Sequence, residues 1–221
     1  MSDNSFYPFK PCNYVDGKIY GKRTWLITPK IDGIRAVCRD AICNKYRTKE
    51  ALFTVQGKRV ANNHIRNILG EHIGLLQGFD GELGGLKPTN KSAFKTAVTL
   101  VQTINAISDN WRWYVFNYFG DGSKAYCSKP FSERWADAKE KWSQLPEHIQ
   151  EHVLMLEPIA MSTLAQAKEY ADSLVKRGYE GAIFTVPEAP YLCKRNVISE
   201  PWSLKYKPFD FLEARIVGFK E

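Results

Sequence analysis

The chain has few of the features that mark secreted, disulfide-bonded or membrane-embedded proteins. Its five cysteines are an odd number with no Cys-x-x-Cys spacing, which argues against a disulfide framework and a cysteine-type zinc site. No apolar run is long enough to cross a bilayer, and the N-terminus has no basic segment followed by an apolar core. We therefore expect a cytoplasmic protein with reduced thiols and no membrane association.

The composition that is present is typical of a globular protein with an anionic partner. The 221 residues are enough to bury a large core, with 44% apolar and 13% aromatic content. The formal net charge is +7 and the pI is about 9.1, with lysine and arginine spread along the chain rather than gathered in a tail. This favours a basic surface, but charge alone does not separate nucleotide, RNA and DNA as partners.

The spacing of apolar residues and turn signals predicts a mixed α+β chain in which strands dominate and no repeat occurs. A polar lead-in over residues 1–24, with one short hairpin, precedes the first strand. We expect antiparallel or mixed sheets packed with helices. Helices are predicted over residues 62–76, 92–107 (with Ser92 as its cap), 131–143 and 163–177. Strands are predicted over residues 25–31, 35–39, 52–55, 78–83, 113–119, 152–157, 181–186, 202–207 and 211–219.

The strongest chemical signal lies in residues 28–35, Thr-Pro-Lys-Ile-Asp-Gly-Ile-Arg. Side chains alternate along an extended segment, so Lys30 and Asp32 point the same way. Gly33 permits a turn or a close approach, and Arg35 offers a planar fork of donors to phosphate oxygens. An amine, a carboxylate and a phosphate clamp together indicate phosphoryl or nucleotidyl chemistry. An exposed hairpin with a weak surface ion pair would have the same residues.

Three later strand ends carry charges of the same kind. Asp80-Gly81-Glu82 and Glu180-Gly181 place a carboxylate beside a glycine on an apolar strand, which suits contact with a hydroxyl group or Mg²⁺. Lys205 and Lys207 fall on one face of a strand, where they repel each other unless an anion lies between them. Each pattern alone is also typical of a solvated turn or a protected edge strand. Their order along one chain carries more information than any one of them.

That order resembles the covalent nucleotidyltransferase superfamily, which comprises polynucleotide ligases and mRNA capping enzymes. Lys30, Asp32, Gly33 and Arg35 match every fixed position of its first motif, K-x-D-G-x-R. Asn117 departs from the aromatic motif, which usually reads Phe-Asp. The later motifs are matched in order by Asp80-Gly81-Glu82, Phe116-Asn117, Glu180-Gly181, and Lys205 with Lys207; Arg47-Thr48 resembles the loop that ligases use on nick phosphates.

Within the superfamily, the chain is most similar to the adenylation domain of a compact, phage-type, ATP-dependent DNA ligase. This resemblance implies an ATP-grasp-like nucleotidyltransferase domain over residues 25–210, with the nucleotide in a groove between the sheets. Residues 211–221 resemble the strand leading to the family's C-terminal OB domain, which we expect to be missing. Such a ligase acts, as a monomer, on nicked duplex DNA in replication, repair and recombination, and in the host cytoplasm if a phage encodes it.

The resemblance also implies the reaction and a role for each candidate residue. Lys30 would attack ATP to form lysyl-AMP, AMP would pass to the 5′-phosphate of a nick, and a 3′-hydroxyl would displace it, with Mg²⁺ or Mn²⁺ present. The implied catalytic residues are Lys30, Asp32, Arg35, Glu180, Lys205 and Lys207; the nucleotide contacts are Thr28, Lys30, Arg35, Glu82 at the ribose, Phe116 on the adenine, Lys205 and Lys207; the nick-phosphate contacts are Arg35, Arg47 and Thr48; the metal contacts are Glu180 and Glu82.

Other functions stay open at this point. An RNA ligase and an mRNA guanylyltransferase share the covalent lysine step, and a nucleotide- or nick-binding module without turnover would have the same fold. The Glu180-Gly181 form differs from the Asp-Gly of capping enzymes. Residues 148–152 also fit the inverted zinc-protease signature H-x-x-E-H, although we expect a solvated helix end there. Cys38 and Cys43 are expected to be core or strand residues.

Overall fold

A computed structural model of the chain describes residues 8–39, 52–54 and 58–208. Its helices are α1 (Asn63–Gly70), α2 (Ile73–Leu76), α3 (Ala93–Gln102), α4 (Lys124–Cys127), α5 (Phe131–Ser143), α6 (Glu147–Gln150) and α7 (Leu164–Lys176). Its strands are β1 (Cys12–Asn13), β2 (Trp25–Lys30), β3 (Ile34–Cys38), β4 (Leu52–Thr54), β5 (Phe79–Gly85), β6 (Trp111–Tyr118), β7 (Val153–Met155), β8 (Ile159–Met161), β9 (Gly181–Thr185) and β10 (Ser203–Tyr206).

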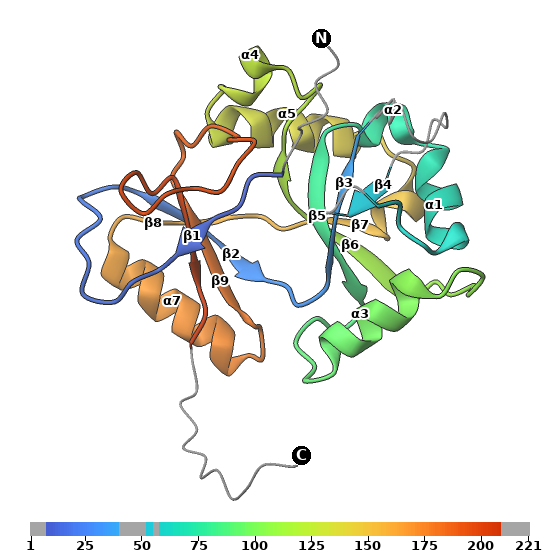
Figure 1. Ribbon diagram of the computed structural model, residues 1–221, viewed down its shortest axis with the longest axis horizontal. Helices are drawn as coiled ribbons and strands as arrows, with labels where there is room; N and C mark the ends of the chain where they lie inside the picture. The colour runs from blue at the N-terminus through green and yellow to red at the C-terminus, as the bar shows by residue number, and fades with distance from the viewer. Residues whose placement is uncertain (1–7, 40–51, 55–57, 209–221) are drawn as a thin grey trace, which may run out of the picture.

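The strands form two sheets that lie side by side (Figure 1). The first sheet has the order β1-β10-β9-β2-β8, and the second has the order β4-β3-β5-β6-β7. Within the described residues most neighbours are antiparallel, and β1–β10 and β6–β7 are parallel. The mixed α+β architecture predicted from the sequence is therefore confirmed, with each sheet containing a parallel pair.

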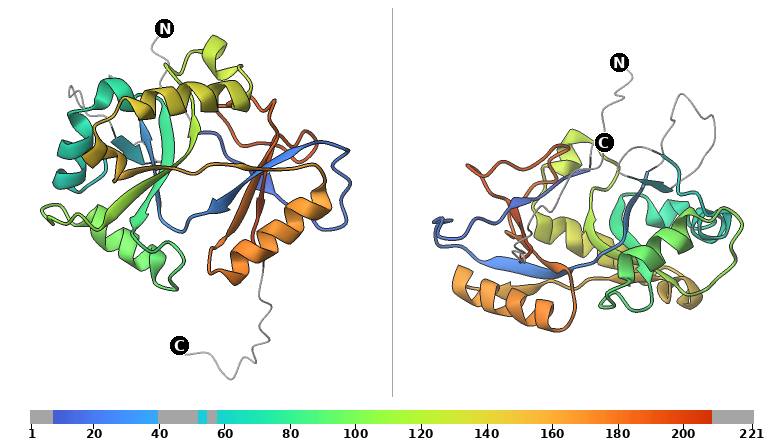
Figure 2. Two further views of the ribbon diagram at one scale, coloured as in Figure 1. Left: turned by 180° about the vertical axis from the view of Figure 1, so that it is seen from behind. Right: turned by 60° about the horizontal axis from the view of Figure 1, so that its bottom comes forward.

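Each sheet has its own helices, and the hydrophobic core lies between sheet and helix. Helix α7 packs on β2 and β9 of the first sheet, while α3 packs on β5 and α5 on β6 of the second, as the two views in Figure 2 show. Trp25 and Ile27 of β2 are fully buried, as are Ala167 and Ala171 on the facing side of α7. The alternation of buried positions in β2 explains why its sequence pattern predicts a strand.

The connection from β2 to β3 sets the positions of the candidate catalytic residues Lys30 and Arg35. Strand β2 belongs to the first sheet and β3 to the second, so residues 31–33 cross from one sheet to the other. Figure 1 shows this crossing in the middle of the molecule. Lys30 ends β2 and Arg35 lies in β3, so the K-x-D-G-x-R stretch bridges the two sheets.

Three expected elements are wrong in extent. The helix over 62–76 is divided into α1 and α2, and the helix from Ser92 ends at Gln102 instead of near residue 107. The strand over 152–157 is shorter, and an unexpected strand, β8, follows it and pairs with β2. The hairpin in the lead-in does not form within residues 8–24, because β1 pairs with β10. The expected strand 211–219 lies outside the described residues.

A single buried side chain accounts for the early end of α3. Asn62 caps α1 by accepting a hydrogen bond from the Ile65 backbone N–H (3.0 Å). Its amide nitrogen donates to the carbonyl oxygens of Leu100, Thr103 and Ala106, at 2.9, 3.0 and 3.0 Å. These bonds hold the chain after Gln102 against α1, whereas the Ser92 side chain makes no capping bond. A contact between residues this far apart leaves no periodic signal in the sequence.

None of the helices in the described part of the chain has the length and apolar character needed to span a bilayer.

Candidate active site

Strand pairing brings the predicted nucleophile to a carboxylate 150 positions away in the chain. In the antiparallel pair β2–β9, Lys30 is opposite Gly181, so its ammonium group reaches Glu180 and the two form an ion pair. Lys207 donates from Nζ to Oε1 of the same carboxylate at 2.9 Å. Gly181 is needed for this packing, because a Cβ there would lie 2.1 Å from the carbonyl oxygen of Tyr206. Three neighbouring strand ends therefore converge on Glu180.

The pKa values of the two carboxylates near Lys30 are shifted in opposite directions, that of Glu180 downward and that of Asp32 upward. Burial alone would raise the pKa of Glu180, but the hydrogen bonds from Lys30 and Lys207 lower it below its ordinary value. Burial raises the pKa of Asp32, and the negative charge of Glu180 raises it further. Glu180 is thus held as an anion by the two lysines, and Asp32 lies close enough to be affected by its charge.

On the second sheet, Arg35 is held in place by Asp80, which the sequence pattern places at the acidic end of a strand. Asp80 is fully buried and accepts hydrogen bonds from Arg35 at 2.9 Å (Nε to Oδ1) and 2.6 Å (Nη2 to Oδ2). Tyr191 donates to Asp80 Oδ2 at 2.7 Å, and Arg35 Nη2 donates to the Phe9 carbonyl at 2.7 Å. Burial alone would lower the pKa of Arg35, but Asp80 raises it above its ordinary value. We call Arg35, Asp80 and Tyr191 the arginine clamp.

A bulge positions the aromatic residue of the site. In the β5–β6 pair, Gly81 is opposite Val115 and Asp80 is opposite Asn117, so Phe116 is the extra residue on β6. Its ring lies against the guanidinium of Arg35, with 5.3 Å between the guanidinium carbon and the ring centroid. The bulge therefore places Phe116 beside Arg35 on the wall of the groove between the sheets.

Of these residues, Lys30, Arg35 and Phe116 line one cavity of about 380 Å³, a volume within the range of small-ligand sites. It lies where the two sheets meet, because both sheets and the crossing between them contribute side chains. The lining residues used below are Thr28, Lys30, Arg35, Glu82, Phe116, Lys205, Lys10 and Arg195.

Known structures share this architecture. The sequence matches no protein-family model and no curated protein. Chlorella virus DNA ligase-adenylate superposes with a TM-score of 0.72 at 24% identity, over 92% of this chain and 69% of that chain. The ATP-dependent DNA ligase of bacteriophage T7, in complex with ATP, gives 0.67 at 16% identity over the same shares. A minimal Lig E DNA ligase gives 0.66 at 15% identity, again over 92% and 69%.

The chain has the nucleotidyltransferase-domain fold of DNA ligases. At these identities the likeness establishes the fold, and the activity has to be argued from the site. The fold predicted from the motif resemblance is confirmed, including the groove between two sheets.

The nucleotidyltransferase fold gathers most of the predicted site residues. Thr28, Lys30, Arg35, Glu82, Phe116 and Lys205 line the cavity, while Glu180 and Lys207 join Lys30 at its edge. The predicted nick-phosphate residues Arg47 and Thr48, and also Cys43, lie outside the described residues. The roles assigned to all these residues stay predictions, since proximity alone does not test them.

Several residues around this cavity were not singled out from the sequence. Tyr191 completes the arginine clamp, and Phe9, Lys10 and Arg195 line the cavity. They come from the lead-in and from the long connection between β9 and β10. Neither segment has an apolar period or a known motif spacing, so no sequence signal marked them.

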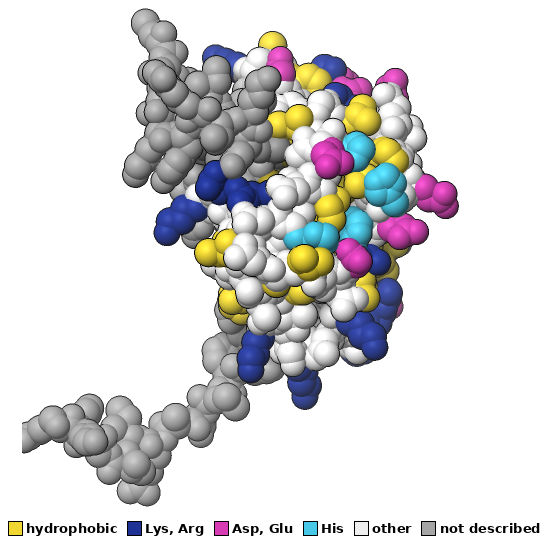
Figure 3. All heavy atoms as spheres, turned by 90° about the vertical axis from the view of Figure 1, so that its right-hand side faces the viewer, with side chains coloured by type: hydrophobic (Ala, Val, Ile, Leu, Met, Phe, Trp, Pro, Cys, Tyr) yellow, Lys and Arg dark blue, Asp and Glu magenta, His cyan; other side chains and the backbone are white. Residues whose placement is uncertain are grey.

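Within the described part of the chain, the histidines are not arranged as a metal centre. Figure 3 shows histidine side chains gathered on one face of the molecule. His148 lies against His72, with 6.1 Å between the ring centroids, whereas His152 stacks on Trp111 at 4.2 Å. Among the described residues, no group of three or more His, Cys, Asp or Glu side chains is arranged to hold a metal ion. The H-x-x-E-H match therefore belongs to α6 and the turn after it.

The raised pKa of Glu82 predicts that the stability of the folded protein depends on pH. Burial raises the pKa of Glu82 to about 8, although Arg35 and Lys30 act in the opposite direction. In the unfolded chain the pKa of this carboxyl is near its ordinary value of 4.5, so at intermediate pH the folded protein keeps a proton that the unfolded chain has lost. The stability of the ligand-free protein should therefore fall as the pH rises from about 4.5 to about 8.

The measurement is the urea midpoint at steps from pH 5 to pH 9 for wild type, Glu82→Gln and a control, Glu157→Gln. Glu157 has an exposed side chain. Glu82→Gln should have a smaller decline with pH than wild type, and Glu157→Gln should keep the wild-type decline. Parallel curves for wild type and Glu82→Gln would contradict the assignment.

Gly33 explains why the first motif needs a glycine. A Cβ at Gly33 would lie 2.4 Å from the Leu83 carbonyl oxygen and 2.9 Å from Cγ of Glu82, so the crossing packs directly on β5. We expect Gly33→Ala to cost about 1–3 kcal/mol of unfolding free energy through overpacking. The control is Gly74→Ala in α2, where a Cβ meets no atom within 4 Å. Urea denaturation should show the control equal to wild type or more stable; equal stability of the two variants would refute the packing argument.

Proposed function

We propose that the chain is the adenylation domain of an ATP-dependent DNA ligase, with Lys30 as the nucleophile. The observation that carries the proposal is the position of Lys30. It ends β2 at the wall of a nucleotide-sized cavity, paired with Glu180, which also binds Lys207. A lysine at a cavity edge, surrounded by cations, suits attack on a phosphate group.

The first step would transfer AMP from ATP to the lysine. Attack requires the neutral amine, so Lys30 must leave its ion pair with Glu180 and lose a proton to solvent. The nitrogen then bonds to the α-phosphorus, the bond from that phosphorus to the bridging oxygen breaks, and pyrophosphate leaves. Lys205 at the cavity and Lys207 beside Glu180 would stabilise the negative charge that develops on the phosphate oxygens.

The remaining cavity residues fit the parts of a nucleotide. Phe116 offers an aromatic face for adenine, and the buried Thr28 lines the same cavity. Glu82 is the residue that we assign to the ribose hydroxyls. Arg35, held by Asp80, would bind the ribose or the 5′-phosphate of a nick, and Asp32 would act when the 3′-hydroxyl attacks.

The residues present fit a divalent ion that is bound mainly by the substrate. Mg²⁺ is usually held by one or two carboxylates together with substrate phosphates, so a cluster of three protein ligands is not required. Glu180, and Glu82 on the other wall, would be the protein ligands. Burial, and to a smaller extent the negative charge of Glu180, raises the pKa of Glu82. Bound Mg²⁺ or Mn²⁺ supplies positive charge to the phosphate oxygens.

The substrate would be nicked duplex DNA, and the enzyme would act as a monomer in the cytoplasm, in strand joining during replication, repair or recombination. The solved ligases share the fold and one of them is a ligase-adenylate, which supports this choice over an mRNA guanylyltransferase.

The test is labelling with ATP or GTP carrying a radioactive α-phosphate, followed by addition of nicked substrates. We expect covalent label from ATP and its release on a DNA nick with a 5′-phosphate. Label from GTP instead would favour a guanylyltransferase, and transfer to RNA nicks alone would favour an RNA ligase. Absence of label from either nucleotide would leave only a binding module.

A further inference from the structure

Two cysteines from distant parts of the sequence lie side by side in the fold. Cys127 ends α4 and is buried, whereas Cys193 lies in the β9–β10 connection and is exposed. Their thiols are hydrogen-bonded to each other. Neither side chain lines the nucleotide cavity, so the pair lies outside the candidate active site.

Backbone contacts hold the two segments together at this point. Tyr191 N donates to the carbonyl oxygen of Cys127 at 2.7 Å, and Cys193 follows Tyr191 after one intervening residue. The Cys127 backbone N–H donates to the Ser123 oxygen at 2.9 Å, so the helix fixes this residue from the other side. The thiols are therefore brought together by backbone that is itself hydrogen-bonded.

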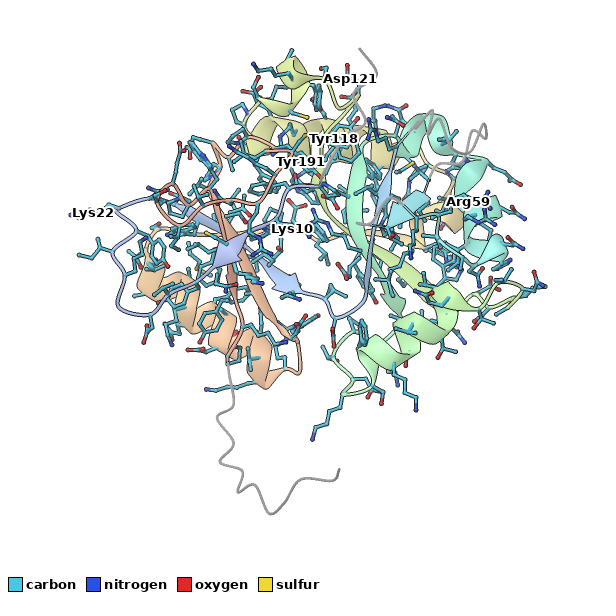
Figure 4. All side chains as sticks on the ribbon, viewed as in Figure 1. Lys10, Lys22, Arg59, Tyr118, Asp121 and Tyr191 are labelled. Carbon is cyan, nitrogen blue, oxygen red and sulfur yellow. The ribbon has the colours of Figure 1, made fainter. Side chains whose placement is uncertain are left out.

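The pair lies at the border of a small hydrophobic cluster. Cys127, Phe119 and Tyr191 belong to this cluster, and Cys127 Sγ lies 3.8 Å from the Phe119 carbonyl oxygen. Tyr191 is buried, and Figure 4 shows it in the interior of the molecule. Cys127 is thus shielded by its neighbours, and Cys193 is the member of the pair that a dissolved reagent meets first.

A buried thiol beside an exposed one is the arrangement of a resolving cysteine and an attacking cysteine. The hydrogen bond with Cys193 raises the pKa of Cys127 above its ordinary value, and burial raises it further, so Cys127 is protonated while Cys193 reacts. Cys12 is the contrasting case. It is buried, and its thiol contacts oxygen atoms, those of the Ser203 carbonyl (3.5 Å) and the Asn196 side chain (4.0 Å).

We propose that Cys127 and Cys193 form a reversible disulfide, which locks the β9–β10 connection onto α4. The oxidant is a small-molecule disulfide such as oxidised glutathione. The Cys193 thiolate attacks one sulfur of this disulfide, the bond between its two sulfurs breaks, and one glutathione thiolate leaves. Cys127 then loses its proton to solvent, attacks the Cys193 sulfur and expels the second glutathione. Two protein thiols are oxidised, and the small disulfide is reduced to two thiols.

The disulfide would strengthen the attachment of a segment that belongs to the arginine clamp. Tyr191 is held to Cys127 by its backbone N–H, and its hydroxyl group donates to Asp80 Oδ2 at 2.7 Å. A bond between Cys127 and Cys193 closes a long loop and so lowers the entropy of the unfolded chain. The oxidised protein should therefore resist urea better than the reduced one. In a reducing compartment the bond would form only under oxidative conditions.

The test treats the native, nucleotide-free protein with oxidised glutathione, blocks the remaining thiols with N-ethylmaleimide and maps the cysteine peptides by mass spectrometry. Wild type should yield linked peptides containing Cys127 and Cys193, which dithiothreitol separates. Cys127→Ser should instead retain about tenfold or more glutathione on Cys193 than wild type, because the neighbouring thiol that displaces it is absent. Cys193→Ser should form no such link, and the control Cys12→Ser should form it as wild type does.

Two further measurements guard the interpretation. Cys127→Ala repeats the comparison, since a hydroxyl group at this buried position can weaken folding. The urea midpoint of wild type should be higher when linked than when reduced, and Cys193→Ser should show no such rise after oxidation.

The disulfide is refuted if wild type and both Cys127 variants retain equal glutathione on Cys193, or if the link forms in the urea-unfolded chain but not in the native protein. A lower midpoint for the linked protein would refute the lock, because the fold would then be strained by the bond. None of these readouts uses ATP or DNA, so the result is independent of the proposed ligase activity.

Discussion

Lys30→Ala is expected to abolish covalent labelling by ATP, with a loss of about a thousandfold or more in the rate of AMP transfer. The physical reason is that among the described residues no other amine combines the two features of Lys30: it lines the cavity and it also contacts Glu180. Lys205 lines the cavity without a contact to Glu180, and Lys207 contacts Glu180 from an exposed position. The measurement is the initial rate of label incorporation at saturating ATP.

The same variant should still seal a nick that carries AMP on its 5′-phosphate, within about tenfold of wild type, because the nucleophile is then no longer needed. Lys207→Ala is the matched control: it removes the other lysine on Glu180, should slow labelling, and should leave the label on Lys30. Undiminished labelling of Lys30→Ala would overturn the assignment of the nucleophile. Loss of sealing on the pre-adenylated nick would mean that Lys30 has a role beyond carrying AMP.

The local part of the site could be predicted from the sequence, because it depends on residues close together in the chain. The alternation around Trp25 predicts a strand, and the glycine at position 33 predicts a turn or a close approach of the backbone. The strand is found as β2, and Gly33 packs closely against Leu83. The contact of Lys30 with Glu180 is different in kind. It requires β2 to pair with β9 in one register, and nothing in either strand specifies that partner. The order of motifs, read as a family resemblance, assigns Lys30 and Glu180 to one site but does not predict their contact.

The arginine clamp shows why part of the site was missed. Asp80 reads as an acidic strand tip in the sequence, yet it is fully buried and bound by Arg35 and Tyr191. Its burial depends on the β9–β10 connection, a segment without periodicity whose path is set by tertiary contacts such as the hydrogen bond from Tyr191 N to the Cys127 oxygen (2.7 Å). The periodicity of apolar residues along the sequence cannot predict a contact of this kind.

Asn117, the position that departs from the family's aromatic motif, has a structural explanation of the same kind. Its side-chain oxygen accepts from Arg134 Nη1 at 2.7 Å and from the Tyr118 backbone N–H at 2.9 Å. Arg134 is buried and also donates to the carbonyl oxygens of Tyr118 and Ala189. The Asn117 amide thus links β6 to Arg134 of α5, and Arg134 in turn binds the β9–β10 connection. With asparagine at position 117, Phe116 still occupies the bulge.

Asp80→Asn is expected to have the largest effect on stability, a loss of about 3–5 kcal/mol of unfolding free energy. The change keeps the shape of the side chain but leaves the buried guanidinium of Arg35 without its counter-ion, and an uncompensated buried charge costs more than the pair contributes. The control is Asp109→Asn, which makes the same change at a side chain that is 82% exposed and paired with His64, and it should cost less than about 1 kcal/mol.

Urea unfolding of these two variants, of Arg35→Met and of Arg35→Met/Asp80→Asn separates charge from packing. If the stranded charge causes the loss, the double variant recovers part of it, since no buried cation is left unpaired. If the double variant is as unstable as the sum of the single changes, packing is responsible and the clamp is not electrostatic. If the double variant recovers stability but does not seal nicks, the buried ion pair serves function: Asp80 is present because Arg35 is needed at the cavity.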